Sequence, residues 1–184
     1  ITPHLDKLAS DGIRFSDAHT SSAVCTPTRY GILTGRYNWR SRLKSGVLSG
    51  FSEALINSDR LTVGKLLQSK NYHTAFIGKW HLGSDPTGFD RWIVLPGQGV
   101  YWDPAFLVPG RKLTIQGHCT EVTTQLGIEW LNTRPKDKPF FLMLHQKAPH
   151  RPWEPDERNQ ALFKDKVIPE PDTLWDDYAT RPAA

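Results

Sequence analysis

Three residues of one short segment together suit a covalent catalyst: Cys25, Pro27 and Arg29. Proline has no amide hydrogen to lose and its φ suits a first helical turn, so Pro27 predicts a helix that begins beside the cysteine. The thiol then lies at the positive end of the helix dipole, and Arg29 adds positive charge one turn later. These surroundings favour a thiolate nucleophile, although a buried structural thiol is at this point an equally open interpretation of Cys25.

Two further groups of lysine and histidine side chains follow short apolar runs. Lys79 and His81 come directly after the run 74–77, and the stretch 145–150, rich in these residues, follows the run 140–144. Polar residues in such positions collect at the carboxyl ends of the strands of an open α/β sheet. Lysine suits an oxyanion as a point charge, and histidine suits proton transfer near neutral pH. The pattern therefore predicts that these side chains meet at one edge of a sheet, but on this pattern alone a solvated lysine and a structural loop histidine are the favoured interpretations of Lys79 and His81.

Three sequence blocks occur in order along the chain. Residues 25–36 begin with Cys-x-Pro-x-Arg and end with Thr-Gly-Arg, residues 78–83 read Gly-Lys-Trp-His-Leu-Gly, and residues 149–153 read Pro-His-Arg-Pro-Trp. Together they resemble the signatures of the type I, formylglycine-dependent sulfatases of the alkaline phosphatase superfamily. Segments 2–9 and 88–90 resemble the same family, so the resemblance covers nearly the whole chain. A cysteine phosphatase is a poorer match, because its motif needs more than the three residues found here between cysteine and arginine.

The resemblance implies a mechanism in which a formylglycine-generating enzyme oxidises Cys25 to formylglycine. The hydrate of that aldehyde then attacks the sulfur of a sulfate monoester, and its second hydroxyl later expels the sulfate. By the same resemblance Arg29 holds the nucleophile, Lys79 contacts sulfate oxygens and His81 acts as a base. His150 is implied as general acid for the leaving oxygen or as a sulfate ligand.

Sulfated sugars and aryl sulfates are both expected substrates. The segments 95–99 and 145–150 resemble bacterial sulfatases that act on sulfated sugars, including N-acetylglucosamine-6-sulfate. Lys147 and His145 are candidates for contacts with sulfate or sugar, and Trp102 is a candidate for stacking on a sugar ring. A structural role is an equally open interpretation of each of these three residues.

The resemblance also implies one Ca²⁺ ion held by oxygen ligands, with Cys25, as formylglycine, among them. The family's aspartate and asparagine ligands belong upstream of segment 2–9 and downstream of His150, so we expect this chain to lack them. Asp176 and Asp177 stand in a proline-rich stretch and are interpreted as a solvated pair. The chain is thus expected to be an internal fragment of a sulfatase N-terminal catalytic domain, truncated at both ends and inactive alone.

The composition limits the function classes further. The 184 residues allow one domain with a core, and 23 basic against 19 acidic residues leave a net charge of +4, which suits an anionic substrate. The chain has no run of five basic residues, so nucleic-acid binding is not expected. The longest apolar run, 140–144, is too short to span a bilayer. Two cysteines predict no disulfide framework, and Cys119 is interpreted as a partly buried structural residue.

The chain contains no signal peptide, and the family resemblance implies a periplasmic or secreted protein. Two other functions stay open. The first is a phosphatase or phosphonate hydrolase of the same superfamily, which a comparison of sulfate and phosphate esters would distinguish. The second is a non-catalytic carbohydrate-binding relative, which the joint presence of the candidate catalytic residues disfavours. Conversion of Cys25 to the aldehyde would argue further against it.

The elements that must position these residues alternate between helix and strand. Helices are expected at 2–10, 26–34, 61–70 and 121–133, and strands at 13–15, 74–77 and 139–145, the last of them buried. This order predicts an α/β fold with a mixed, mainly parallel sheet flanked by helices. Losing the family's first strand is expected to expose a sheet edge and to lower solubility. Three segments are expected to be irregular: the exposed loop 36–59, the stretch 85–117 with a short hairpin, and the proline- and charge-rich connecting segment 154–184.

Overall fold

The computed structural model describes residues 2–49 and 52–179. The chain divides into two compact units, Ile1–Pro149 and His150–Ala184, and each is described here by itself. Among the described residues, every helix and strand lies in the first unit, and the second consists of turns and irregular chain. The division falls close to the start of the expected connecting segment, 154–184.

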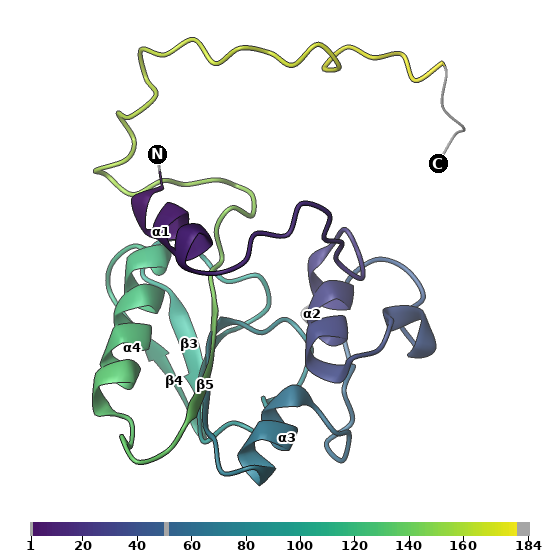
Figure 1. The fold of residues 1–184 in the computed structure, drawn as a ribbon, viewed down its shortest axis with the longest axis vertical. Helices are drawn as coiled ribbons and strands as arrows, with labels where there is room; N and C mark the ends of the chain where they lie inside the picture. Colours follow the sequence, from purple (N-terminus) through teal and green to yellow (C-terminus); the bar gives the residue numbers. More distant parts are fainter. Residues whose placement is uncertain (1, 50–51, 180–184) are drawn as a thin grey trace. The chain divides into compact units, whose positions relative to one another are not determined.

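A five-stranded mixed sheet forms the centre of the first unit (Figure 1). β2, β1 and β5 run parallel, whereas β3 pairs antiparallel with both β2 and β4. The expected mixed sheet is therefore confirmed, and the carboxyl ends of its three parallel strands lie at the same end of the sheet. The spatial order is β4-β3-β2-β1-β5, with the bounds β1 (His73–Lys79), β2 (Arg91–Leu95), β3 (Ala105–Val108), β4 (Arg111–Thr114) and β5 (Phe140–His145).

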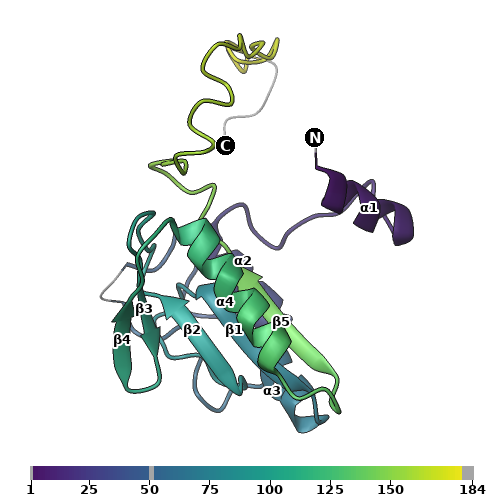
Figure 2. The same cartoon turned by 90° about the vertical axis from the view of Figure 1, so that its left-hand side faces the viewer.

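Helices cover both faces of this sheet. Figures 1 and 2 show α4 (Cys119–Thr133) lying across one face, with α2 (Cys25–Thr34) and α3 (Val63–Ser69) on the other. The short 3-10 helix η1 (Asn38–Arg40) packs against α2. The first helix, α1 (Pro3–Asp11), has no buried residue. The sheet is thus the middle layer of three, which is the arrangement that an α/β fold requires.

β1 is buried on both faces because its side chains alternate between two cores. Phe76 packs in a cluster with Tyr30 of α2, whereas Ala75 and Ile77 pack with Trp130 of α4. A parallel strand covered on both faces has a continuous apolar sequence, and that sequence predicted this strand correctly.

The predicted helices are confirmed with small shifts at their ends. The helix that carries the cysteine begins at Cys25 itself and is capped by Gly35, which has a φ of 66° and donates its N–H to Gly31 O at 2.9 Å. α3 begins only at Val63 because Thr62 is its N-cap and accepts a hydrogen bond from the backbone N–H of Lys65.

Two long segments that were expected to be irregular contain core structure. Residues 85–117 contain the predicted hairpin, which is β3 with β4, but also the unexpected central strand β2. The prediction of an exposed loop at 36–59 is wrong in part, since four of its side chains are buried in the core shared with α2: Leu43, Leu48, Leu55 and Ile56.

Two strand predictions are also corrected. Residues 13–15 form no strand, and their apolar side chains are exposed. β5 is not a buried strand: among the described strands it pairs with β1 alone, and Phe140 is 42% and Leu144 38% exposed. β5 is therefore a sheet edge. The low solubility that we expected of such an edge stays a prediction.

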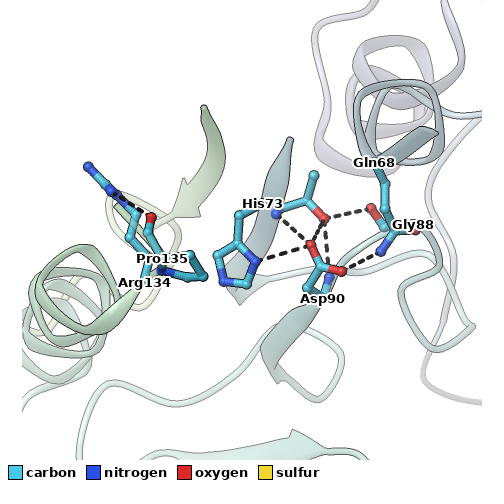
Figure 3. A network of polar contacts seen from close by, with 7 residues as sticks. Gln68, His73, Gly88, Asp90, Arg134 and Pro135 are labelled. Carbon is cyan, nitrogen blue, oxygen red and sulfur yellow. Dashed lines mark hydrogen bonds and ion pairs between the residues drawn. The ribbon is translucent and has the colours of Figure 1, made fainter. Parts of the chain in front are cut away.

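One carboxylate ties the amino end of β1 to α3 and β2, as Figure 3 shows. Asp90 accepts hydrogen bonds from the backbone N–H of Thr74 and from Gln68 Nε2, both at 2.8 Å, and lies 3.4 Å from His73 Nδ1. Partial burial alone would raise the pKa of Asp90, but the hydrogen bonds from Thr74 and Gln68 outweigh it and lower the pKa below its ordinary value. His73 thus has a structural contact.

We expect Asp90→Asn to destabilise the fold by about 1–3 kcal/mol. The NH₂ group of the new asparagine must face either the N–H of Thr74 or the amide of Gln68, and two donors cannot form a hydrogen bond with each other. Urea unfolding of the two proteins at neutral pH measures the difference. The pKa of Asp90 is lower in the folded state, so the stabilisation is present above the unfolded-state pKa and disappears as the pH falls through the folded-state pKa. The control is Asp137→Asn, at an exposed carboxylate. Equal unfolding free energies for the two variants would contradict this role of Asp90.

Candidate active site

Cys25 lies at the first position of α2, at the end of the sheet where the parallel strands finish. Val24 before it is extended, with φ −131° and ψ 164°, and its carbonyl accepts the N–H of Thr28. The Cys25 thiol is half-buried. The predicted position at the start of a helix is confirmed, and it gives the side chain the positive end of the helix dipole.

His81 contacts the cysteine directly. Its Nδ1 lies 3.4 Å from Cys25 Sγ, and its Nε2 lies 3.0 Å from the carbonyl oxygen of Leu48. A carbonyl only accepts hydrogen bonds, so the hydrogen of a neutral ring belongs on Nε2 and the lone pair of Nδ1 faces the sulfur. His81 has a φ of 55°, which turns the chain back toward α2 just after β1 ends. The geometry suits a base acting on a group attached at position 25.

Arg29 is held by the ends of two strands. Its Nη1 donates a hydrogen bond to the carbonyl oxygen of Lys79, at the end of β1. The same Nη1 donates to Nδ1 of His145, at the end of β5, over 2.8 Å. Burial, and then the adjacent Arg29 charge, lower the pKa of His145 to about 4, so the imidazole is neutral and can accept this bond. Arg29 Nε is buried without a hydrogen-bond partner among the described residues.

Two buried lysines meet at one glutamine. Lys79 and Lys147 are only 2% and 4% exposed. Lys79 donates to the side-chain oxygen of Gln98, while Lys147 donates to the backbone oxygen of Gln98 at 3.2 Å and lies 4.6 Å above the Tyr101 ring. Burial lowers the pKa of Lys79; the facing Cys25 opposes that shift, and the charges of Arg29 and Lys147 add to it.

The positive charge of this group is not balanced by acidic side chains. None of the contacts that Arg29, Lys79 and Lys147 make in the described part of the chain is to a carboxylate. Burying a cation without an anionic partner is costly, so such an arrangement persists where a site needs it. Arg29 and Lys79 both interact electrostatically with Cys25, which places these two cations beside the thiol. The site can therefore bind an oxyanion next to Cys25.

The structure brings five of the predicted residues together: Cys25, Arg29, Lys79, His81 and His145. Lys147 joins them through Gln98. Trp102 does not enter this group by any contact in the described residues. It pairs with His118, with ring centroids 5.2 Å apart, and is 39% exposed. His150 belongs to the second unit, where its Nδ1 lies 2.8 Å from the Arg151 carbonyl oxygen.

Gln98 is the residue of this group that the sequence interpretation missed. It follows β2, just as Lys79 ends β1 and His145 ends β5. The same rule, a polar residue after an apolar strand, would have found Gln98 if the strand 91–95 had been predicted.

The described residues offer no calcium site of their own. In 2–49 and 52–179, no group of three or more His, Cys, Asp or Glu side chains could hold a metal ion. Calcium prefers six or more oxygen ligands, and the group around Cys25 is cationic, so these residues alone do not fit the ion. Nor does the part of the chain that the structure describes contain a helix long and apolar enough to cross a membrane.

Comparison with known proteins identifies one family throughout the chain. The sequence model of the Sulfatase family matches residues 1–180. The chain is 42% identical over 185 aligned positions to an N-acetylglucosamine-6-O-sulfatase of Bacteroides thetaiotaomicron, covering 98% of this chain and 32% of that protein. It is 41% identical over 103 positions to human arylsulfatase A, covering 52% of this chain and 20% of the enzyme.

The structural comparison agrees. A protein solved in complex with its substrate, D-glucosamine-2-N,6-O-disulfate, superposes with a TM-score of 0.88 at 42% identity, covering 98% of this chain and 36% of that one. The chain thus spans about a third of the length of the relatives it matches over nearly its whole length.

Proposed function

Since this chain belongs to the sulfatase family, we propose that its protein hydrolyses sulfate monoesters through a nucleophile made from Cys25. The observation that carries the proposal is the pair of cations Arg29 and Lys79 beside that residue, with Lys147 joined to Lys79 through Gln98 and no carboxylate among their contacts in the described residues. A sulfate ester is an anion whose oxygens need this positive charge as the sulfur is attacked. The family relationship extends the proposal to the formylglycine form of Cys25, and hence to a formylglycine-generating enzyme as a partner.

Each residue of the site has a defined task in this proposal. Formylglycine supplies, as its hydrate, the hydroxyl groups that attack sulfur and later release sulfate. His81 accepts a proton at Nδ1, because Leu48 keeps the hydrogen on Nε2. When substrate binds, Lys79 and Lys147 release their hydrogen bonds to the oxygens of Gln98 and donate to sulfate oxygens instead. Arg29, fixed through Nη1, supplies positive charge to the oxyanion, and its buried Nε has no hydrogen-bond partner among the described residues.

His150 is proposed as the acid that protonates the leaving oxygen, as the family relationship suggests. The family also uses Ca²⁺, and we propose the same for the whole protein. No step of the scheme above passes through the ion, because the described residues do not form its site. A periplasmic or secreted location is proposed on the same family basis.

We propose a sulfated amino sugar, with the ester at O6, as the substrate. The relatives support this choice, since one is named an N-acetylglucosamine-6-O-sulfatase and another is solved with a glucosamine 6-O-sulfate. A cavity of about 300 Å³ beside His81 also supports it, because Ser49, Ser52, Ser84 and Asp85 line this cavity together with apolar groups. Hydroxyl and carboxylate groups beside an apolar wall suit the hydroxyls and ring faces of a sugar.

The test uses protein of full natural length, produced together with a formylglycine-generating enzyme. Peptide mass spectrometry of the tryptic fragment 15–29 reports whether the side chain at 25 has exchanged its sulfur and two hydrogens for one oxygen. Rates are then compared on N-acetylglucosamine-6-sulfate, an aryl sulfate and the matching phosphate esters. Preference for the sulfates supports the proposal. Preference for phosphates would assign a related phosphatase, and an unmodified, inactive protein would indicate a non-catalytic relative.

Lys147→Met is expected to lower the activity and to raise the stability of the protein. Loss of one buried cation should lower kcat/KM by about 10²-fold on a sulfate ester. The same change should raise the free energy of unfolding by about 1 kcal/mol, because methionine fills the buried space without an unpaired charge. Steady-state kinetics and urea unfolding measure the two effects. Lys138→Met, at an exposed lysine, serves as the control. A Lys147→Met protein that is less stable than the parent, or equally active, would contradict the anion-site assignment of Lys147.

A further inference from the structure

The net positive charge of the chain is concentrated in one stretch. Residues 36–65, here called the basic segment, contain six basic and two acidic residues, a net charge of +4 that equals the net charge of the whole chain. The other residues are neutral on balance. The six basic residues are Arg36, Arg40, Arg42, Lys44, Arg60 and Lys65.

Three of these arginines line a single cavity. Arg40, Arg42 and Arg60 surround a space of about 190 Å³, here called the arginine cavity, which also borders Asn57. Its wall includes the buried Tyr30 of α2 and the buried Leu55. Guanidinium groups match the oxygens of sulfate or phosphate in pairs, so three of them around one cavity favour a tetrahedral oxyanion.

No acidic side chain neutralises these three arginines within the described residues. The Arg42 guanidinium donates to the backbone carbonyl of Glu53, which fixes its direction without cancelling its charge. The side chains of Arg40 and Arg60 make no ion pair or hydrogen bond in that part of the chain, although Glu53 and Asp59 belong to the same segment. The positive potential of the arginine cavity is therefore available to a ligand.

The basic segment also packs directly against the candidate active site. The carbonyl oxygen of Leu48 accepts a hydrogen bond from His81 Nε2 at 3.0 Å. The backbone N–H of Leu55 donates a hydrogen bond to the carbonyl oxygen of Leu82, also at 3.0 Å. Tyr30 lies five residues after Cys25 on α2, which corresponds to about 7–8 Å along the helix axis. In Figure 1 this part of the chain runs beside α2. The arginine cavity is thus offset from Cys25 along α2 by a distance that a glycan more than one sugar long can span.

We propose that the arginine cavity of Arg40, Arg42 and Arg60 binds a second sulfate group of a polysulfated glycan whose scissile ester lies at Cys25. This inference rests on the proposed function, and it adds that the preferred substrate is a multiply sulfated chain. The contact stabilises bound substrate and does not touch the reacting atoms, so it affects KM and leaves kcat unchanged.

The experiment compares two glucosamine-based tetrasaccharides of equal length on the full-length, formylglycine-bearing protein. One carries a single 6-O-sulfate at its non-reducing end, and the other carries a 6-O-sulfate on every sugar. The main variant is the double substitution Arg40→Gln and Arg60→Gln, because neither side chain makes a hydrogen bond or ion pair within the described residues. The matched control removes two exposed charges from the β3–β4 hairpin, by Arg111→Gln and Lys112→Gln.

For the parent protein, KM should be about tenfold lower for the fully sulfated tetrasaccharide than for the monosulfated one. The double variant should lose most of this difference at unchanged kcat, while the hairpin control should keep it. Added salt should shrink the difference in the parent. Equal KM values for both sugars in the parent, or an equal effect of the hairpin control, would overturn the proposal.

Binding measurements separate a failure of this inference from a failure of the proposed function. Calorimetry on the Cys25→Ala protein with the fully sulfated tetrasaccharide reports the arginine cavity without turnover. If the parent hydrolyses neither sugar but binding still weakens in the double variant, the proposed function fails and the cavity assignment stands. If inorganic sulfate binds there as tightly as the tetrasaccharide, the cavity holds a free anion and the glycan assignment is wrong.

Discussion

Replacing Cys25 with alanine is expected to lower kcat on a sulfate ester by about 10⁴-fold or more, because the nucleophile itself is removed. Alanine has no sulfur that can be exchanged for the aldehyde oxygen. Arg29, Lys79 and His81 stay in place, since their contacts with Lys79 O, Gln98 and Leu48 do not involve the thiol. Substrate binding should therefore survive while turnover is lost. Single-turnover kinetics and substrate calorimetry on the same preparation distinguish the two.

The matched control is Cys119→Ala, the other cysteine of the chain. Cys119 is fully buried in a core cluster with Ile93 and Phe106, and burial raises the pKa of its thiol, so it is a poor nucleophile. Its substitution should reduce stability and leave kcat unchanged. A Cys25→Ala protein with more than about one-hundredth of the parental kcat would show that the nucleophile lies elsewhere.

Much of the candidate site could be predicted because the family resemblance rests on short sequence blocks, and each of these residues also follows a local pattern. Pro27 lies in the first turn of the helix of Cys25 and Gly35 ends that helix, and an apolar run precedes both Lys79 and His145. Such patterns depend only on residues that are close in sequence, and the predicted helix and strands are present in the structure. The partnerships were not predictable in the same way: Arg29 and His145 are 116 residues apart, and only the parallel register of β1 with β5 brings them together.

The errors in the fold have a related cause. The stretch 85–117 is dense in glycine, proline and aromatic residues, which hides the five-residue strand β2 and the role of Gln98 after it. The segment 36–59 looks like a surface loop because of its serines and arginines. Its buried Leu48 and Leu55 have no helical or strand periodicity, since irregular chain carries them to the core. β5 is the opposite case, because its apolar sequence predicted burial, whereas among the described strands it pairs with β1 alone and lies at the sheet edge.

Gly78→Ala is expected to prevent the parallel strands from pairing at the site. Gly78 has a φ of 105°, and a Cβ there would lie 2.0 Å from the carbonyl oxygen of His145. That oxygen is backbone, so the contact is relieved only if β1 and β5 separate where they are in register. The same two strand ends hold Nη1 of Arg29, so separation also releases the guanidinium. We expect a loss of more than about 4 kcal/mol in unfolding free energy, or an insoluble protein.

Gly97→Ala is the control that isolates this clash from backbone strain. Gly97 also has a positive φ, 53°, but a Cβ there meets nothing within 4 Å. Its substitution should cost only the left-handed conformation of a non-glycine residue, about 1–2 kcal/mol. Urea unfolding and the soluble yield of both variants provide the comparison. If the ends of β1 and β5 position Arg29, Gly78→Ala must lower the free energy of unfolding much more than Gly97→Ala does. Equal losses would mean that β1 and β5 can move apart freely, and Arg29 would then need another anchor.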